Sequence, residues 1–337
     1  MKVRWGIVGL GQMAQCFAEA NKYVNNSELF AVASTNKGRL NEFAQNFDIA
    51  KKYAFKTYTE LICCDEVDAV YIALTNNLHF EMIMKCMEFQ KHVLVEKPAT
   101  INAKEMVYIS EKINKGTTLF AEGFAYLYHP ATKRYLEMIK DGLIGQPISL
   151  NTRFGFKILS DKQNFIKRIF KKEGRHFNEK LGGGCILDLG CYLTSISRVV
   201  AGIALKQDGL DLIINKSKKH FGTKKVEIDA TCEILFNSKL TSSLHASFNS
   251  DLGQKTIITG TEGEIVINNT WSCQDNGFFY NGVFQKIDRL VYDNVYSYQI
   301  HSISDWILNN ILIPEFPSHS YNETLSNMQI LDKWKRS

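Results

Sequence analysis

The chain has 337 residues, of which 45% are hydrophobic, and its formal net charge is +5. This length suits two domains, and the apolar content lets both bury a core without disulfide or metal staples. No apolar run approaches the roughly 20 residues that span a bilayer, and the N-terminus reads as a strand rather than a signal peptide, so we expect a soluble, cytoplasmic protein with no membrane partner.

The cysteines and lysines add little to this picture. The eight cysteines show neither metal-ligand spacing nor a secreted framework, which indicates reduced thiols. A basic cluster runs over residues 216–219 and continues at Lys224 and Lys225. With no nucleic-acid-binding motif beside it, we interpret the cluster as a solvated loop between strands and expect no nucleic-acid partner.

Residues 1–123 alternate short apolar runs with helical stretches. The pattern predicts strands at 2–8, 29–34, 68–74, 92–96 and 118–122, and helices at 11–22, 38–47, 79–89 and 103–115. Such alternation is typical of βαβ units in a doubly wound parallel sheet.

The pattern changes after His129-Pro130. A helix is expected up to Asp141, then strands at 148–158, 210–214, 230–236, 239–247, 255–260 and 264–267, and helices at 184–200, 298–310 and 322–335. Consecutive strands without helices between them favour an antiparallel sheet, so residues 124–337 are predicted to form an α+β domain.

A dinucleotide-binding turn follows the first strand. Gly9-x-Gly11-x-x-Ala14 provides a tight turn, close backbone approach to a pyrophosphate, and close packing of helix on strand. Gln12 and Met13 begin the helix, whose N–H groups face the phosphates.

The end of the second strand bears on the choice of cofactor. It reads Ser34-Thr35-Asn36-Lys37, with Arg39 close behind and no carboxylate before Glu42. NAD sites usually carry an acid here, whereas a hydroxyl and a cation suit a 2′-phosphate. We therefore predict NADP, with NAD as the alternative.

Two further segments carry candidate catalytic groups. Lys97 follows the carboxyl end of a buried strand, where open α/β sheets bind ligands, and Pro98 restricts it to extended geometry. Asp188 and Tyr192 lie four residues apart on a predicted helix and so share a face. The triple glycine at 182–184 either lets another backbone pass close by or opens the helix without steric cost.

These motifs, in this order, resemble the glucose-fructose oxidoreductase, inositol dehydrogenase and MocA family of NAD(P)-dependent oxidoreductases over almost the whole chain. The resemblance rests on five segments: the glycine turn, Tyr71 to His79, Glu96-Lys97-Pro98, Glu122 to Pro130, and Gly182 to Tyr192. The tail Tyr321 to Trp334 also fits.

The resemblance implies a Rossmann domain, a second domain with an open, mostly antiparallel sheet, and a homodimer or dimer of dimers through that sheet. It implies that Lys97 contacts the reacting hydroxyl or carbonyl, with Asp188 beside it and Tyr192 as acid and base. The cofactor contacts expected beyond the glycine turn and the second strand are Thr75, Asn76, His79, Glu96 and Lys97 itself. The expected substrate contacts are Phe124, Tyr126 and Arg175.

A tyrosine at position 192 resembles the sugar oxidoreductase and dihydrodiol dehydrogenase branches. The expected reaction is hydride transfer between nicotinamide and a hydroxyl or carbonyl carbon of a sugar, nucleotide sugar or related polyol. The alternatives are a trans-dihydrodiol dehydrogenase and a non-catalytic sensor of sugar or dinucleotide. One departure is Leu127, where relatives often carry arginine.

Overall fold

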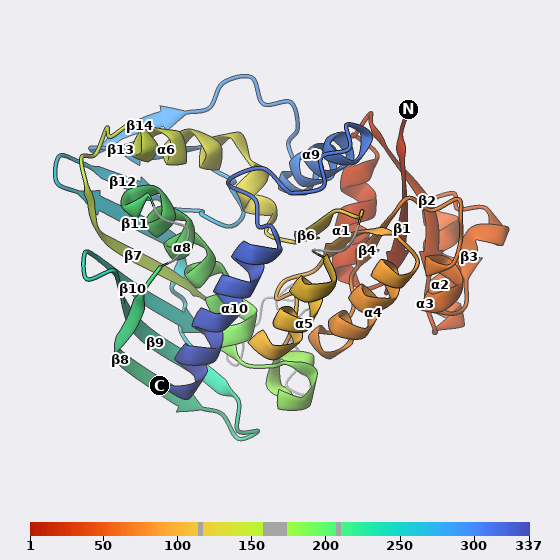
Figure 1. Ribbon diagram of the computed structural model, residues 1–337, viewed down its shortest axis with the longest axis horizontal. Helices are drawn as coiled ribbons and strands as arrows, with labels where there is room; N and C mark the ends of the chain where they lie inside the picture. The colour runs from red at the N-terminus through yellow and green to blue at the C-terminus, as the bar shows by residue number, and fades with distance from the viewer. Residues whose placement is uncertain (114–116, 158–173, 207–209) are drawn as a thin grey trace. The chain divides into compact units, whose positions relative to one another are not determined.

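The described part of the chain comprises residues 1–113, 117–157, 174–206 and 210–337 of a computed structural model (Figure 1). It forms two units by internal contact: Met1–Tyr128 with Val291–Ser326, and His129–Leu290 with Asn327–Ser337. We call them the Rossmann unit and the sheet unit.

The Rossmann unit is built on a parallel sheet. In spatial order its strands are β3 (Ala54–Phe55), β2 (Ser27–Ala33), β1 (Val3–Val8), β4 (Ala69–Ile72), β5 (His92–Val95) and β6 (Phe120–Glu122). The order reverses beside β1, which pairs with both β2 and β4. Ligands of such sheets bind at this reversal, outside the carboxyl ends of the strands. The glycine turn leaves β1 at that place.

Helices and short 3₁₀ turns connect these strands. They are α1 (Gln12–Asn21), α2 (Lys37–Asn46), η1 (Lys51–Tyr53), α3 (Tyr58–Ile62), α4 (Asn76–Glu88), α5 (Ala103–Ile113), η2 (Ala125–Tyr128) and α9 (Val295–Leu308). The late helix α9 packs against α1 and β1: Ser297 Oγ donates to Ala20 O of α1 at 3.0 Å, and the Trp5 indole of β1 donates to Ser304 Oγ at 3.0 Å.

The sheet unit holds a mostly antiparallel sheet. In spatial order its strands are β14 (Val283–Lys286), β13 (Gly277–Tyr280), β12 (Glu264–Ile267), β11 (Gly253–Gly260), β7 (Pro147–Gly155), β10 (Leu240–Ser247), β9 (Glu227–Phe236) and β8 (Leu212–Phe221). The pairing of β7 with β10 is parallel, and the other described pairings are antiparallel.

One face of this sheet is covered and the other is open. The helical elements in the described residues of the unit are α6 (Pro130–Lys140), η3 (Arg175–Phe177), η4 (Glu179–Leu181), the π-helical turn η5 (Ile186–Gly190), α8 (Cys191–Leu205) and the end of α10 (Tyr321–Arg336). Helix α8 packs on β7 and β10. Along β9 and β10, alternate residues such as Ile234 and Leu244 are buried, while Glu233 and Ser243 between them stay half exposed.

The predicted fold class is confirmed: a doubly wound parallel sheet is followed by an open, mostly antiparallel one. One expectation needs correction, and two others fall on residues that the structure does not describe. Residues 216–219 belong to strand β8 and are not a loop, although Lys224 and Lys225 do lie in the turn that follows it. The predicted ends of the helix at residue 115 and of the strand at residue 158 fall outside the described residues.

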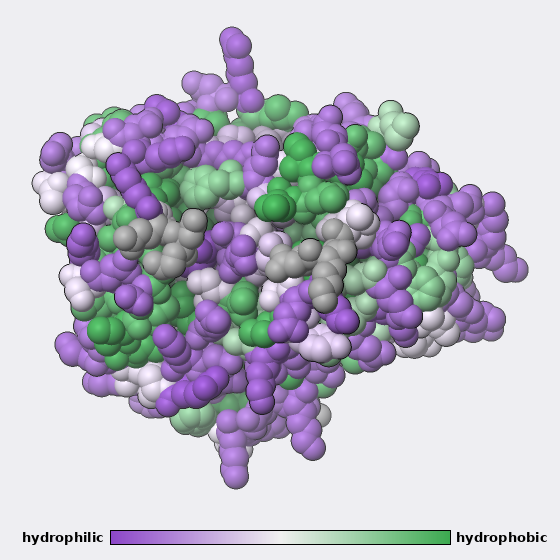
Figure 2. All heavy atoms as spheres, viewed as in Figure 1, coloured by the Kyte–Doolittle hydropathy of each residue, from purple (hydrophilic) through white to green (hydrophobic). Residues whose placement is uncertain are grey.

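The stretch Glu179–Leu205 is long and apolar enough to cross a membrane by composition, yet 83% of its most apolar window is buried inside the structure. That degree of burial is typical of the core helix of a soluble domain. Hydrophilic side chains predominate on the face shown in Figure 2, with scattered apolar patches between them.

Candidate active site

The glycine turn between β1 and α1 is shaped by two glycines with different tasks. Gly9 has φ +88°, and a Cβ there would lie 2.7 Å from Ala73 O, so a larger residue does not fit. A Cβ on Gly11 would meet nothing within 4 Å, and Gly11 provides no side-chain cap to helix α1. The uncapped first turn therefore borders open space, where a pyrophosphate can accept from backbone N–H groups. The structure fits a dinucleotide at this turn.

The end of β2 presents the residues predicted to choose the cofactor. Ser34 is buried, and its hydroxyl accepts from the Asn36 N–H at 3.2 Å. Asn36 in turn caps α2 by accepting from the Arg39 N–H at 2.9 Å. These two bonds fix the backbone, while the side chains of Thr35, Lys37 and Arg39 are exposed at the edge of the sheet.

Three contacts fix the segment that carries Lys97, after β5. The Tyr71 hydroxyl donates to Glu96 Oε1 at 2.6 Å. The Pro98 carbonyl lies 2.9 Å from His79 Nδ1, and the Ala99 N–H donates to Glu122 Oε1 at 2.9 Å. Lys97 itself is half-buried, and its bond to Pro98 is cis. The lysine thus projects from a backbone held on both sides.

The Tyr71–Glu96 bond has a defined polarity. Burial, and then the neighbouring Glu96, raise the pKa of the Tyr71 phenol well above its ordinary value near 10. The phenol therefore keeps its proton and donates it to the carboxylate. A carboxylate that receives a hydrogen bond inside the unit avoids the cost of an unpaired buried charge.

His79 was predicted to line the nicotinamide pocket, and the structure gives it two backbone partners. Its ring is fully buried between the Pro98 carbonyl, on Nδ1, and the Leu74 carbonyl, 3.2 Å from Nε2. The imidazole thereby links the ends of β4 and β5. Thr75 and Asn76, predicted beside it, begin helix α4 from the same edge. Cofactor contact by these residues stays a prediction.

The predicted substrate aromatics of this unit lie in its interior. Phe124 and Tyr126 are fully buried, and their rings meet edge to face at 6.2 Å. Phe124 also contacts His319, whose Nδ1 lies 3.5 Å from Glu122 Oε2. Substrate contact by Phe124 and Tyr126 stays a prediction.

In the sheet unit, the triple glycine lets two backbones touch. A Cβ on Gly183 would lie 2.7 Å from both Arg175 O and His176 O. Gly184 has φ +108°, and its N–H donates to His176 O at 2.9 Å. Of the two roles considered for the glycines, close passage of another backbone is the one observed here.

Asp188 lies in the π-turn that this packing opens. It is 4% exposed, and its Oδ2 lies 3.1 Å from His176 Nδ1. Its Oδ1 is 4.0 Å from Arg175 Nη2. Arg175, predicted as a substrate contact, is therefore placed beside Asp188. π-helical turns are rare in proteins, and those that occur often lie at functional sites.

Tyr192 begins α8 and stands in a group of aromatic rings. Its ring centroid lies 5.5 Å from that of Phe154 and 5.3 Å from that of Trp271, and Phe156 packs edge-on against Phe154. Tyr192 and Phe156 are partly exposed. Phe154 and Trp271 are buried beside them, so Tyr192 and Phe156 are the rings of this group that can stack on a sugar ring or an arene.

Two members of this site were missed in the sequence. His176 is twelve residues from Asp188, and Trp271 is 79 residues from Tyr192, by their numbers in the chain. The position of His176 next to Arg175, before the glycines, was the available signal for it. No local pattern marks Trp271.

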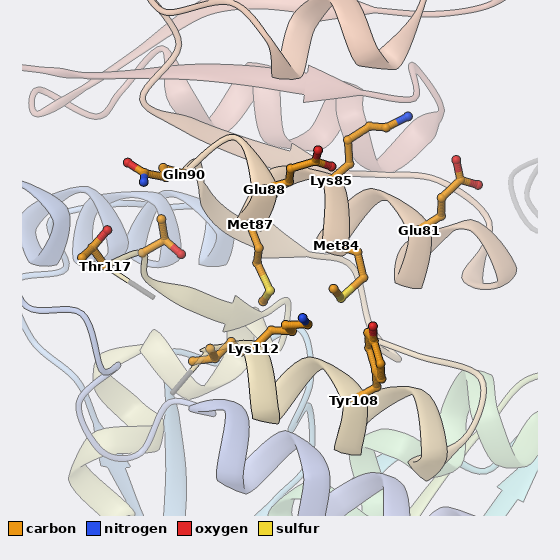
Figure 3. Close-up of a pocket in the computed structure, with 11 residues that line it drawn as sticks. Glu81, Met84, Lys85, Met87, Glu88, Gln90, Tyr108, Lys112 and Thr117 are labelled. Carbon is orange, nitrogen blue, oxygen red and sulfur yellow. The ribbon is translucent and has the colours of Figure 1, made fainter. Parts of the chain in front are cut away.

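A separate groove of about 650 Å³ lies between α4 and α5. Met84 and Met87 of α4 face Tyr108 and Lys112 of α5 across it (Figure 3). None of the predicted site residues is among those that line this groove.

Comparison with known proteins decides the family. Residues 3–124 match the oxidoreductase family with an NAD-binding Rossmann fold, GFO/IDH/MocA, and residues 132–266 match the GFO/IDH/MocA C-terminal domain. The chain belongs to the GFO/IDH/MocA family. It is an NAD(P)-dependent oxidoreductase, as the motifs predicted.

Relatives of this GFO/IDH/MocA protein include trans-1,2-dihydrobenzene-1,2-diol dehydrogenase of Mus musculus, 28% identical over 276 residues, which are 81% of this chain and 76% of the relative. D-xylose 1-dehydrogenase (NADP(+)) 2 of Haloferax volcanii is 31% identical over 175 residues, 52% of this chain and 50% of the relative. A 3-ketoreductase from Actinomadura kijaniata, solved with NADP and TDP-benzene, has the same fold, with a TM-score of 0.80, 21% identity and coverage of 100% of this chain and 98% of its own.

Proposed function

We propose that this GFO/IDH/MocA protein is an NADP-dependent dehydrogenase or reductase that transfers a hydride between nicotinamide and a hydroxyl or carbonyl carbon of a sugar, nucleotide sugar or related polyol. The observation that carries the proposal is the fixed segment Glu96–Ala99 at the carboxyl edge of the same sheet as the glycine turn. A lysine held there stands on the edge at which this fold binds its ligands.

The bound nicotinamide supplies the redox chemistry by accepting or giving the hydride. The protein's part is charge and proton control. Lys97 stabilises the developing alkoxide with its ammonium. Tyr192 moves the hydroxyl proton as general acid or base. Asp188 accepts a hydrogen bond from a substrate hydroxyl. The aromatic group around Tyr192 supports stacking of the substrate.

NADP is favoured over NAD by the end of β2. The exposed Lys37 and Arg39 stand where the ribose 2′ position is read in this fold, and no carboxylate occurs in the sequence between Ser34 and Asn41. The D-xylose dehydrogenase named above is NADP-dependent by name, which supports the same choice.

A second candidate is oxidation of arene trans-diols. It is supported by the dihydrodiol dehydrogenases, which align with this chain over more than three quarters of its length, and by the partly exposed rings of Tyr192 and Phe156. We further propose a cytoplasmic homodimer that uses the open face of the eight-stranded sheet.

The test is an assay of NADP and NAD reduction across sugars, nucleotide sugars and arene trans-diols. Lys97→Ala is expected to lower kcat by a factor of about 1,000 while NADPH still binds, because an electrostatic donor at the reacting oxygen is lost. Lys104→Ala, an exposed lysine on α5, is the matched control and should keep full activity.

Full turnover by Lys97→Ala would end the assignment of the lysine. Binding of NADPH without turnover of any compound in the panel would favour a sensor instead of an enzyme. Turnover of diols but not of sugars would select the second candidate.

A further inference from the structure

The buried imidazole of His176 has no task in the mechanism above. It lies in η3, is 4% exposed, and places Nδ1 3.1 Å from Asp188 Oδ2. Buried polar groups that are well paired define a unique arrangement, and their loss is costly. The buried ring of His176 therefore contacts a candidate catalytic carboxylate from inside the unit.

Both the backbone and the ring of His176 are held. Its carbonyl accepts from the Gly184 N–H at 2.9 Å, an approach that the absence of a Cβ on Gly183 permits. Its ring meets Phe248, which is fully buried, edge to face at 6.1 Å. The imidazole is thus fixed independently of the carboxylate it contacts.

The chemistry of the pair sets the direction of the bond. An ionised carboxylate only accepts, so Nδ1 carries the hydrogen and donates it to Oδ2. This bond occupies one carboxylate oxygen and determines the rotation of the group. Oδ1 is left toward Arg175, whose Nη2 is 4.0 Å away.

We infer that His176 is a positioning residue for the reaction: its Nδ1–H holds Asp188 in one orientation, so that Oδ1 is presented to Arg175 and to a substrate hydroxyl. The inference rests on the proposed function, because it assumes that Asp188 serves the chemistry. It assigns to the triple glycine a functional role, which is to bring the His176 backbone close enough for this contact.

Two variants at one position separate positioning from folding. His176→Leu removes the hydrogen-bond donor and replaces the ring with an apolar side chain of similar length. His176→Asn keeps an N–H close to the place of Nδ1. The expected result is a fall in kcat of roughly 10- to 100-fold for His176→Leu, the loss typical of a hydrogen bond to a buried charge, with KM for NADP unchanged. His176→Asn should recover most of kcat.

The carboxylate variant distinguishes this inference from the proposed function. Asp188→Asn should lower kcat strongly, and adding His176→Leu to it should cause little further loss because both act on one group. Full kcat in Asp188→Asn would overturn the proposed role of Asp188. Strong loss in Asp188→Asn together with full kcat in His176→Leu would overturn the role of His176 alone.

A merely structural role predicts a different pattern. In that case His176→Leu and His176→Asn would lose activity to the same extent, together with a lower melting temperature and a higher KM for NADP. That outcome would overturn the inference.

Discussion

At the scale of single residues, the position of Lys97 depends on side chains that hold the backbone around it. In the segment Glu96–Ala99, Glu96 accepts from Tyr71, the Pro98 carbonyl contacts His79, and the Ala99 N–H donates to Glu122. Each partner comes from a different element, so no single helix movement releases the lysine. Hydrogen bonds to charged groups contribute about 1.5–3 kcal/mol each, and two of these three end on a carboxylate.

A first prediction at this scale concerns the cofactor. Replacing Lys37 and Arg39 together by alanine should raise KM for NADP by roughly 10- to 100-fold, because charge-assisted bonds to the 2′-phosphate are lost. KM for NAD should stay within a factor of about two, because NAD carries no such phosphate. Steady-state kinetics with both cofactors measure the ratio.

Lys104→Ala serves again as the control for loss of a positive charge elsewhere on the unit. Equal KM for NADP in the double variant and in the unsubstituted protein would contradict the assignment of the 2′-phosphate to this edge.

The sequence predicted one set of residues and missed another for a physical reason. Lys97, Asp188 and the glycines stand in local patterns whose geometry follows from neighbours in the chain. His176 and Trp271 gain their roles through tertiary contact, across twelve and 79 residues respectively. A histidine before a glycine run, or a tryptophan in a loop, carries no period or spacing that announces its partner.

At the scale of elements, the turn η5 and the glycines before it form one device. The backbone of residues 175–178 packs closely against Gly183. The ring of Trp334 packs against Gly190 and would lie 2.8 Å from a Cβ at that position. The helix that carries Asp188 and Tyr192 is therefore fitted against other parts of its unit at both ends of the π-turn.

The glycines give a matched pair of predictions. Gly183→Ala should destabilise the protein by about 2 kcal/mol or more, since its Cβ overlaps backbone atoms that have no room to move. Gly202→Ala, on α8 with open space around it, should instead be neutral or stabilise by about 0.5–1 kcal/mol.

Chemical denaturation of both variants provides the comparison. Two variants of equal stability would contradict the close packing at Gly183. A loss of kcat is also expected in Gly183→Ala, because the partners of Asp188 shift with the backbone.

A pH prediction belongs to the start of α6. His129 caps this helix by accepting from the Ala131 N–H at 3.2 Å, and burial lowers its pKa to about 4, partly offset by a hydrogen bond to Asn276. Above its ordinary pKa near 6.5 the folded and unfolded chains are both neutral here, so its contribution to stability is fully present. As the pH falls toward 4, His129 becomes protonated in the unfolded chain but stays neutral in the folded chain. The contribution of His129 to the unfolding free energy is therefore lost.

His129→Asn removes this titration and keeps a good cap. The unfolding free energy of the unsubstituted protein should therefore fall more than that of the variant between pH 6.5 and 4, by roughly 1–3 kcal/mol. Urea unfolding at a series of pH values measures the difference. Parallel curves would contradict the neutral state of His129.

The misread element is β8. Its lysines at 216, 218 and 219 suggested a loop, because charge runs usually face water. In the structure they lie on an edge strand, where lysine is a common guard against strand pairing between molecules. Short elements such as β3, α3, β13 and β14 were also missed, since two to five residues carry too little periodicity to be recognised.

At the scale of the whole molecule, the open face of the eight-stranded sheet bears on assembly. A row of paired residues runs across it: Ile257, Asn151, Ser243, Glu233 and Lys216. The row is mixed in character and half exposed near its centre, which suits a self-complementary interface.

Ser243→Glu tests the proposed dimer. It adds a charge next to Glu233 and, in a two-fold dimer, does so twice, so it should shift the protein from dimer to monomer at micromolar concentration. Light scattering coupled to size exclusion gives the mass. Ser110→Glu on α5 is the matched control and should stay dimeric, and an unsubstituted protein that runs as a monomer would contradict the dimer directly.

The last helix, α10, packs against the segment that carries Asp188 and Tyr192. Asn327 donates to the Cys191 carbonyl at 3.2 Å, Trp334 fills the space above Gly190, and Lys219 binds the carbonyls of Trp334 and Lys335. Removal of Trp334 is therefore expected to loosen the packing at Gly190, which lies between Asp188 and Tyr192 in the chain. Truncation before this tryptophan should lower kcat, although the two proposed catalytic side chains lie more than a hundred positions upstream.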